Sequence, residues 1–189
     1  MSNYVRSHEL LSRNDSRLLV VDVQEKLISH IDQRDRVVRN CRRLIKAAGI
    51  LSVPTVATEQ YPRGLGATIP ELAVLLGERS DKVRFSCGEV LGWQCQGDDG
   101  FDVDKVVVCG IESHVCVLQT CYDLLSQGFR VYVPADAVGS RSSFDYNFAL
   151  QRLRDTGVVV TTTESVMFEW CEVAGTPEFK QISRLVTEE

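Results

Sequence analysis

Short apolar runs alternate along this chain with segments in which apolar residues recur at helical spacing. Apolar, β-branched runs are typical of strands buried on both faces of a parallel sheet, and the segments between them fit the helices that connect such strands. This alternation predicts a three-layer α/β/α sandwich with a mostly parallel, doubly wound sheet of about six strands. The expected strands include residues 17–23, 52–58, 105–109, 130–134 and 158–162, and the expected helices include 34–48, a helix from Val115 that Gly128 ends, 145–155 and 163–174.

Length and composition limit the classes to which the protein can belong. With 189 residues, 44% of them hydrophobic, the chain can bury one sizeable core, so we expect one domain over residues 1–189 with its core at about 17–186. A formal net charge of -5 does not fit a general nucleic-acid binder, which needs a concentrated excess of lysine and arginine. No apolar run approaches the length of a membrane span or a signal peptide, which favours a cytoplasmic protein.

The seven cysteines are odd in number and irregular in spacing, which fits reduced thiols better than a disulfide framework. Neither the cysteines nor the three histidines form a paired metal-ligand motif, so the sequence predicts no zinc site.

One cysteine stands where chemistry is expected. In the segment KVVVCGIESHVCVLQT, Gly110 is expected to end a buried strand, and Cys116 follows within the first turn or so of a helix. Unpaired N–H groups and the positive end of the helix dipole favour a thiolate there, which suits a nucleophile. A free cysteine is also among the most buried residue types, so a purely structural role stays open.

Two charged residues are expected near the same sheet edge. Asp22 follows the first strand, at the carboxyl end where open parallel sheets bind ligands, although it could instead cap the next helix. Lys82 lies in the segment DKVRFSC; most lysines face solvent, but a lysine near a cysteine and an aspartate in a crevice is a candidate for catalysis. The segment 59–67, rich in proline and glycine, is expected to be a loop at the edge that carries Asp22.

Three segments together, VVDVQ, DKVRFSC and CGIESHVCVLQT, resemble the isochorismatase-like cysteine hydrolases, a superfamily that includes nicotinamidases. The resemblance runs from about Leu18 to Leu185. The segments TEQYPRGLG, ADAVGSR and TTTESVMFE are most similar to the branch whose members are called isochorismatase domain-containing proteins and have no assigned substrate.

The resemblance implies a catalytic triad of Asp22, Lys82 and Cys116. Cys116 would attack a carbonyl carbon to form a thioester, Lys82 would stabilise the thiolate, and Asp22 would transfer protons and activate water. It also implies a cis peptide between Ile111 and Glu112, in a turn that directs backbone N–H groups at the oxyanion. The expected activity is cleavage of a C–N bond in a small amide, without a cofactor. A catalytically silent member that acts as a protein-interaction or regulatory module is the alternative.

The sequence departs from the nicotinamidases at the metal site. Nicotinamidases carry Asp-x-His and a further histidine that bind a metal beside the pocket, whereas TEQYP stands here, so neither a metal nor nicotinamidase activity is expected. Family members are commonly dimers or larger, and the C-terminal segment with Trp170 and Phe179 could supply apolar contact surface, so a homo-oligomer is expected. The residues that could line a substrate pocket are Glu59, Gln60, Tyr61, His114 and Trp170.

Overall fold

The computed structural model describes residues 4–99 and 103–187, so the ends of the expected 1–189 domain and residues 100–102 lie outside the described residues. Within these ranges a sheet of seven strands has the order β3-β2-β1-β4-β5-β7, with β6 paired to β4. All these pairings are parallel. The strands are β1 (Ser16–Val21), β2 (Thr55–Gln60), β3 (Arg79–Lys82), β4 (Lys105–Ile111), β5 (Arg130–Pro134), β6 (Val138–Gly139) and β7 (Val159–Thr161).

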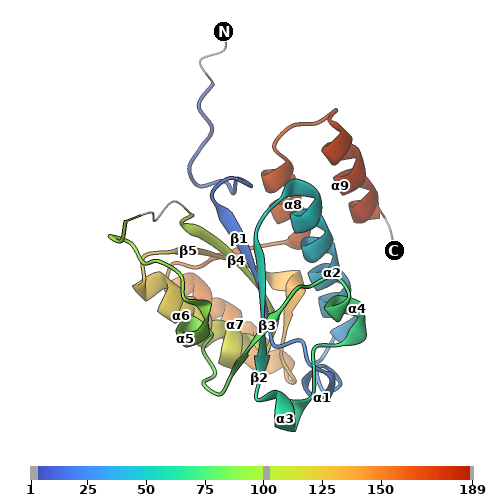
Figure 1. Ribbon diagram of the computed structural model, residues 1–189, viewed down its shortest axis with the longest axis vertical. Helices are drawn as coiled ribbons and strands as arrows, with labels where there is room; N and C mark the ends of the chain where they lie inside the picture. Colours follow the sequence, from blue (N-terminus) through green and yellow to red (C-terminus); the bar gives the residue numbers. More distant parts are fainter. Residues whose placement is uncertain (1–3, 100–102, 188–189) are drawn as a thin grey trace.

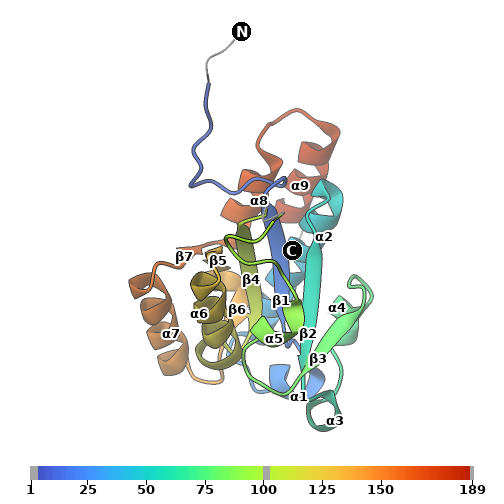
Figure 2. The same cartoon turned by 60° about the vertical axis from the view of Figure 1, so that its left-hand side comes forward.

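Helices cover both faces of this sheet (Figures 1 and 2). One face packs mainly against α2, α8 and α9, and the other against α6 and α7. The helices are α1 (Glu25–Ile28), α2 (Arg34–Leu51), α3 (Pro62–Leu65), α4 (Pro70–Ala73), α5 (Gly88–Leu91), η1 (Ser113–Val117), α6 (Leu118–Ser126), η2 (Ala135–Ala137), α7 (Ser143–Asp155), α8 (Thr163–Cys171) and α9 (Pro177–Thr187). The predicted fold class is therefore confirmed, and the strand count differs from about six through the two-residue strand β6, which is too short to show a periodicity.

Strand β4 shows why the apolar runs are continuous. Val106 and Val108 belong to the core beneath α6 and α7, whereas Val107 and Cys109 belong to the core beneath α2 and α8. Because successive side chains of a strand point to opposite faces, a strand covered by helices on both sides needs apolar residues at every position.

Gly110 does not end β4, contrary to the prediction. The strand continues to Ile111, and Gly110 pairs with Val21 of β1 and Val138 of β6. Its φ is +114°, and a Cβ atom at this position would lie 2.1 Å from the backbone oxygen of Val21. Glycine is therefore required here by the close approach of the neighbouring strand, not by a turn.

The helix expected over 34–48 is longer than predicted, because α2 continues through Gly49 to Leu51. Leu51 is buried in the same core as Leu44 and Ala48. Burying this last turn outweighs the low helix propensity of one glycine, which is about 1 kcal/mol.

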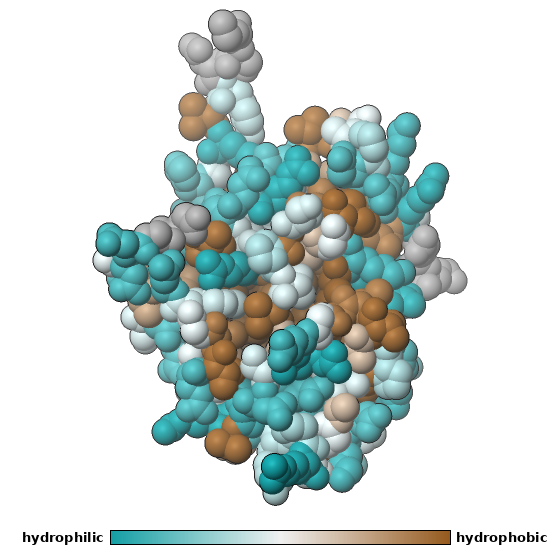
Figure 3. Space-filling view, viewed as in Figure 1, coloured by the Kyte–Doolittle hydropathy of each residue, from teal (hydrophilic) through white to brown (hydrophobic). Residues whose placement is uncertain are grey.

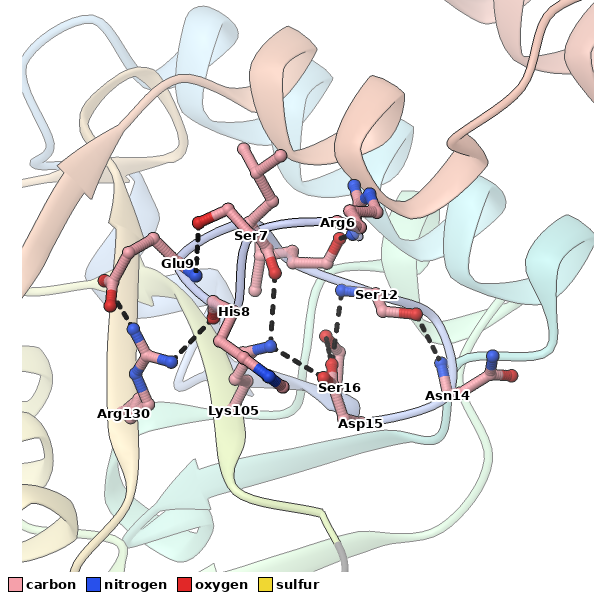
Figure 4. A network of polar contacts seen from close by, with 12 residues as sticks. Arg6, Ser7, His8, Glu9, Ser12, Asn14, Asp15, Ser16, Lys105 and Arg130 are labelled. Atoms are coloured by element: carbon pink, nitrogen blue, oxygen red, sulfur yellow. Dashed lines mark hydrogen bonds and ion pairs between the residues drawn. The ribbon is translucent and has the colours of Figure 1, made fainter. Parts of the chain in front are cut away.

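A polar network holds the N-terminal segment across the amino ends of the strands (Figure 4). The Lys105 side chain is 3% exposed, and its Nζ lies 2.6 Å from Asp15 Oδ2 and 3.1 Å from the Leu10 carbonyl oxygen. Arg130 pairs with Glu9 in the same network. This segment lies at the end of the sheet away from α1 and α3 (Figure 1), which leaves the carboxyl ends of the strands for the candidate site.

Among the described residues, no helix combines the length and apolar character needed to cross a membrane.

Candidate active site

Asp22 follows β1 directly and points into the protein between neighbouring strands. Its Oδ1 accepts a 2.8 Å hydrogen bond from the Thr58 hydroxyl, and its Oδ2 accepts a 2.7 Å bond from Lys82 Nζ. The following helix α1 has Gln24 as its N-cap. The alternative that Asp22 caps this helix is therefore wrong, and its carboxylate instead faces the end of the neighbouring strands.

Lys82 is the last residue of β3, and its side chain is 0% exposed, as is that of Asp22. Besides Asp22, its Nζ donates to Gln60 Oε1 at 2.6 Å and to the Phe85 carbonyl oxygen at 2.8 Å. A longer contact of 3.3 Å reaches the carbonyl oxygen of Arg84. An ammonium group has three N–H bonds, so these short contacts use all of them. Lys82 is therefore an internal cation, not a surface lysine.

Two glutamines extend this network, and one of them was missed from the sequence. Gln60 lies at the end of β2, within the segment 59–67 expected to be a loop, and its Nε2 donates to the Val83 carbonyl oxygen at 2.8 Å. Gln24 accepts from the Gln60 backbone N–H at 2.7 Å and donates back to the Gln60 carbonyl oxygen at 2.9 Å. Sheet pairing decides this arrangement, because β2 pairs with β3 as far as Gln60 and Lys82.

Cys116 lies in η1, a π-helical turn that leads into α6, and it is 5% exposed. Burial raises the pKa of the Cys116 thiol well above its usual range, and the negative charge of Asp22 and a hydrogen bond to its carboxylate act in the same direction. Lys82 acts in the opposite direction and does not outweigh them. The surroundings of Cys116 thus oppose the thiolate that a helix start was expected to favour, because burial and the nearby carboxylate raise the pKa of the thiol.

The peptide between Ile111 and Glu112 is cis, as predicted. Glu112 Oε2 accepts hydrogen bonds from the backbone N–H of Arg141 at 3.0 Å and from its Nε at 3.2 Å. His114 Nδ1 lies 3.0 Å from the Ser140 hydroxyl. Both side chains thus connect the turn before Cys116 to the segment that follows β6.

The site therefore combines a buried carboxylate, an ammonium and a thiol at the carboxyl ends of parallel strands, and comparison with known proteins identifies the family. A family model described as Isochorismatase domain matches residues 16–165. The chain belongs to the isochorismatase family.

Isochorismatase domain-containing protein 2 of Danio rerio is 43% identical to this chain over 176 residues, which cover 93% of this chain and 89% of that protein. The secreted isochorismatase effector Isc1 of Phytophthora sojae is 39% identical over 180 residues, with 93% and 86% coverage. Among solved structures, that of the MAR1 ribonuclease of Caenorhabditis elegans is similar with a TM-score of 0.85 and 40% identity, covering 95% of this chain and 93% of that one. The predicted resemblance is confirmed.

At the position where nicotinamidases bind a metal, this isochorismatase-family chain has side chains that are engaged elsewhere. Glu59 Oε1 accepts from the Thr68 backbone N–H at 2.8 Å and from the Thr68 hydroxyl at 2.7 Å. Burial would raise the pKa of Glu59, but the bonds from Thr68 and the charge of Arg79 together lower it. Gln60 is bonded to Lys82. In the part of the chain that the structure describes, no group of three or more His, Cys, Asp or Glu could hold a metal. These donors do not fit a metal site.

The remaining pocket candidates have different positions. Tyr61 is largely exposed and lines a surface hollow of about 330 Å³ together with Val83 and Glu89, beside Lys82. Trp170 is 0% exposed in the core between α2, α8 and α9, so its assignment to a pocket is wrong. A tryptophan near the end of an amphipathic helix gives no local signal that separates core from pocket.

Thr58 and Cys87 complete the surroundings of Asp22, and neither was among the predicted site residues. Cys87 Sγ lies 3.4 Å from Thr58 Oγ1, and both residues are buried. Burial, followed by the charge of Asp22, raises the pKa of Cys87. All seven cysteines are free thiols.

Proposed function

We propose that this protein is a cofactor-free hydrolase that cleaves a C–N bond in a small amide through Asp22, Lys82 and Cys116. The observation that carries the proposal is the buried Asp22 carboxylate, which accepts a 2.7 Å bond from the Lys82 ammonium and lies close enough to the Cys116 thiol to raise its pKa. A base next to a nucleophile, oriented by a third group, is the arrangement that nucleophilic catalysis needs.

In the first half of the reaction, the Cys116 sulfur attacks the carbonyl carbon of the amide while its proton passes to Asp22. The carbonyl oxygen becomes an oxyanion, and backbone N–H groups of the turn that starts at Ile111 and Glu112 stabilise it. Such a donor can contribute about 3 kcal/mol to transition-state stabilisation. The C–N bond then breaks, Asp22 gives the proton to the leaving amine, and the acyl group remains on Cys116 as a thioester.

In the second half, Asp22 takes a proton from water, and the resulting hydroxide attacks the thioester carbonyl. The C–S bond breaks, the acid leaves, and the proton on Asp22 returns to Cys116. Lys82 transfers no proton in this scheme, because its three donors are committed to Asp22, Gln60 and Phe85. Its role is to hold Asp22 and to offset negative charge on the pair formed by Asp22 and Cys116.

The test is to screen small amides for release of amine and to quench the reaction with acid for mass spectrometry. The proposal predicts an acyl adduct on the peptide that contains Cys116 and loss of turnover in Cys116→Ala. Cys95→Ala is the matched control, because Cys95 is a free and more exposed cysteine and should leave turnover unchanged. Turnover that persists in Cys116→Ala would refute the proposal.

RNA cleavage is a second candidate, because the related C. elegans structure is that of a protein called MAR1 ribonuclease. The net charge of -5 and a thiol that is 5% exposed favour a small neutral substrate over RNA. Purified wild type and Cys116→Ala should therefore both leave a single-stranded RNA intact. RNA cleavage that is lost in Cys116→Ala would replace amide hydrolysis as the function of the site. If neither substrate is turned over, the silent interaction module becomes the better account.

We also propose that the chain self-associates and acts in the cytoplasm, although the Phytophthora relative is called a secreted effector. Figure 3 shows hydrophobic side chains gathered near α4, where Val74 and Leu75 are exposed. The apolar surface does not come from Trp170, which is buried. Light scattering of the purified protein measures the particle mass, and a mass equal to one chain would contradict self-association.

A further inference from the structure

Cys87 is a buried thiol near the triad that the proposed reaction does not use. It is 0% exposed and follows β3 in the segment before α5. Its backbone N–H donates to the Thr120 hydroxyl of α6 at 2.9 Å, which fixes its position. Its Sγ lies 3.4 Å from Thr58 Oγ1.

The direction of the Cys87 contact follows from the proton count at Thr58. A hydroxyl group has one proton, and the Thr58 hydroxyl donates it to Asp22 Oδ1 at 2.8 Å, because an ionised carboxylate can only accept. The hydroxyl can therefore only accept from Cys87, and the Cys87 S–H must be the donor. The bonds run in one direction, from Cys87 to Thr58 to Asp22.

We propose that Thr58 and Cys87 are positioning residues for Asp22, which hold its carboxylate in place and orient it toward Cys116. This inference rests on the proposed function of Asp22 as the base. Thr58 stabilises the charged form of Asp22 by direct donation, and Cys87 strengthens that bond because successive hydrogen bonds polarise one another. Burial raises the pKa of Cys87, which keeps its proton in place.

The titratable groups that face Asp22 come from three segments: Lys82 from β3, Cys116 from η1, and Cys87 from the segment before α5. Removal of the Thr58 donor leaves Lys82 in place and weakens only the stabilisation of the carboxylate. With one donor fewer, the Asp22 carboxylate should accept more strongly from the Cys116 thiol, so Cys116 should keep its proton to higher pH.

The experiment measures the rate of Cys116 alkylation by iodoacetamide as a function of pH, with the product identified by peptide mass spectrometry. This readout needs no amide substrate, so it can fail or succeed independently of turnover. Thr58→Val should move the rise of the rate with pH upward by at most about one unit, because the full effect of one hydrogen bond to a charged group is the upper bound. Cys87→Ala should move it the same way by about 0.3 unit, the effect of lost polarisation.

Three further variants separate this role from a general effect on packing. Thr58→Ser and Cys87→Ser keep a donor at each position and should return the profile toward that of wild type. Cys121→Ala removes another buried thiol from the same core and should leave the profile unchanged. A Thr58→Val profile that coincides with wild type, a Cys87→Ala profile without a shift, or an equal shift in Cys121→Ala would each overturn the inference. If wild type instead releases no amine from any of the small amides screened, that result would count against the proposed function and not against this inference.

Discussion

The ion pair of Asp22 and Lys82 can be used to test how burial changes the contribution of an ion pair to the free energy of unfolding. We consider Lys82→Met, which keeps a long unbranched side chain and removes the ammonium. Arg84→Met is the matched control: Arg84 Nε lies 2.8 Å from Glu89 Oε2, nearly the distance of the buried pair, but the two side chains are 76% and 41% exposed. The two substitutions therefore differ mainly in solvent access.

The two substitutions should reduce the free energy of unfolding by different amounts. Lys82→Met leaves the buried carboxylate of Asp22 without its cation, and it leaves Gln60 Oε1 and the Phe85 carbonyl oxygen without this donor. Removal of one partner from a buried pair costs about 3 to 5 kcal/mol. The exposed pair is worth about 0 to 1 kcal/mol, because water screens it and replaces its hydrogen bonds. We therefore expect Lys82→Met to remove a large part of the free energy of unfolding and Arg84→Met to change it little.

Urea unfolding followed by circular dichroism gives the free energy of unfolding for each variant. Asp22→Asn and the double variant Asp22→Asn/Lys82→Met complete a double-mutant cycle. The double variant should lose about 2 kcal/mol less than the sum of the two single losses, because it no longer buries an unpaired charge. Additive losses, or equal losses for Lys82→Met and Arg84→Met, would refute the assignment of a buried, strongly coupled pair.

Two further predictions concern glycines and thiols. Gly110→Ala should destabilise the fold by about 3 kcal/mol or more, since the new Cβ would lie 2.1 Å from the Val21 backbone oxygen. Gly49→Ala has open space around the new Cβ within α2, so it should stabilise the fold by about 0.5 to 1 kcal/mol. Thermal unfolding of the two variants compares these effects. Burial raises the pKa of Cys116 and Cys121 in the folded chain above the usual 9.0. As the pH rises, the unfolded chain therefore loses these two protons at lower pH than the folded chain does. The contribution of the two thiols to the free energy of unfolding is thus fully present below about pH 9 and falls as the pH rises further. Each thiol changes the free energy of unfolding by at most about 1.4 kcal/mol per pH unit. Cys121→Ala should therefore make the free energy of unfolding, measured with urea between about pH 8 and 11, fall less steeply with pH. An unchanged slope would contradict burial of that thiol.

Periodicity made the fold predictable. Strand and helix signals depend on residues close in the sequence, and the strands buried on both faces could be identified from their continuous apolar runs. The structure differs from the prediction where residues distant in the sequence determine the local conformation or the burial of a side chain. Gly110 continues β4 because Val21 of another strand approaches it closely, and Gly49 stays helical because Leu51 is buried beyond it. Trp170 lies in the core because α2 and α9 cover it, which its own segment does not indicate.

The sequence by itself determined the family, through the order and spacing of several short motifs over one domain. That resemblance in turn predicted the cis peptide after Ile111 and a triad of Asp22, Lys82 and Cys116. Only the tertiary structure decided what surrounds these groups. Asp22 accepts hydrogen bonds from Thr58 and Lys82, which are 36 and 60 residues away in the sequence. The other two donors of Lys82 are taken by Gln60 and Phe85. The same surroundings raise the pKa of Cys116, because the desolvation and electrostatic effects that set a pKa depend on what lies nearby in space, and local sequence does not contain that information.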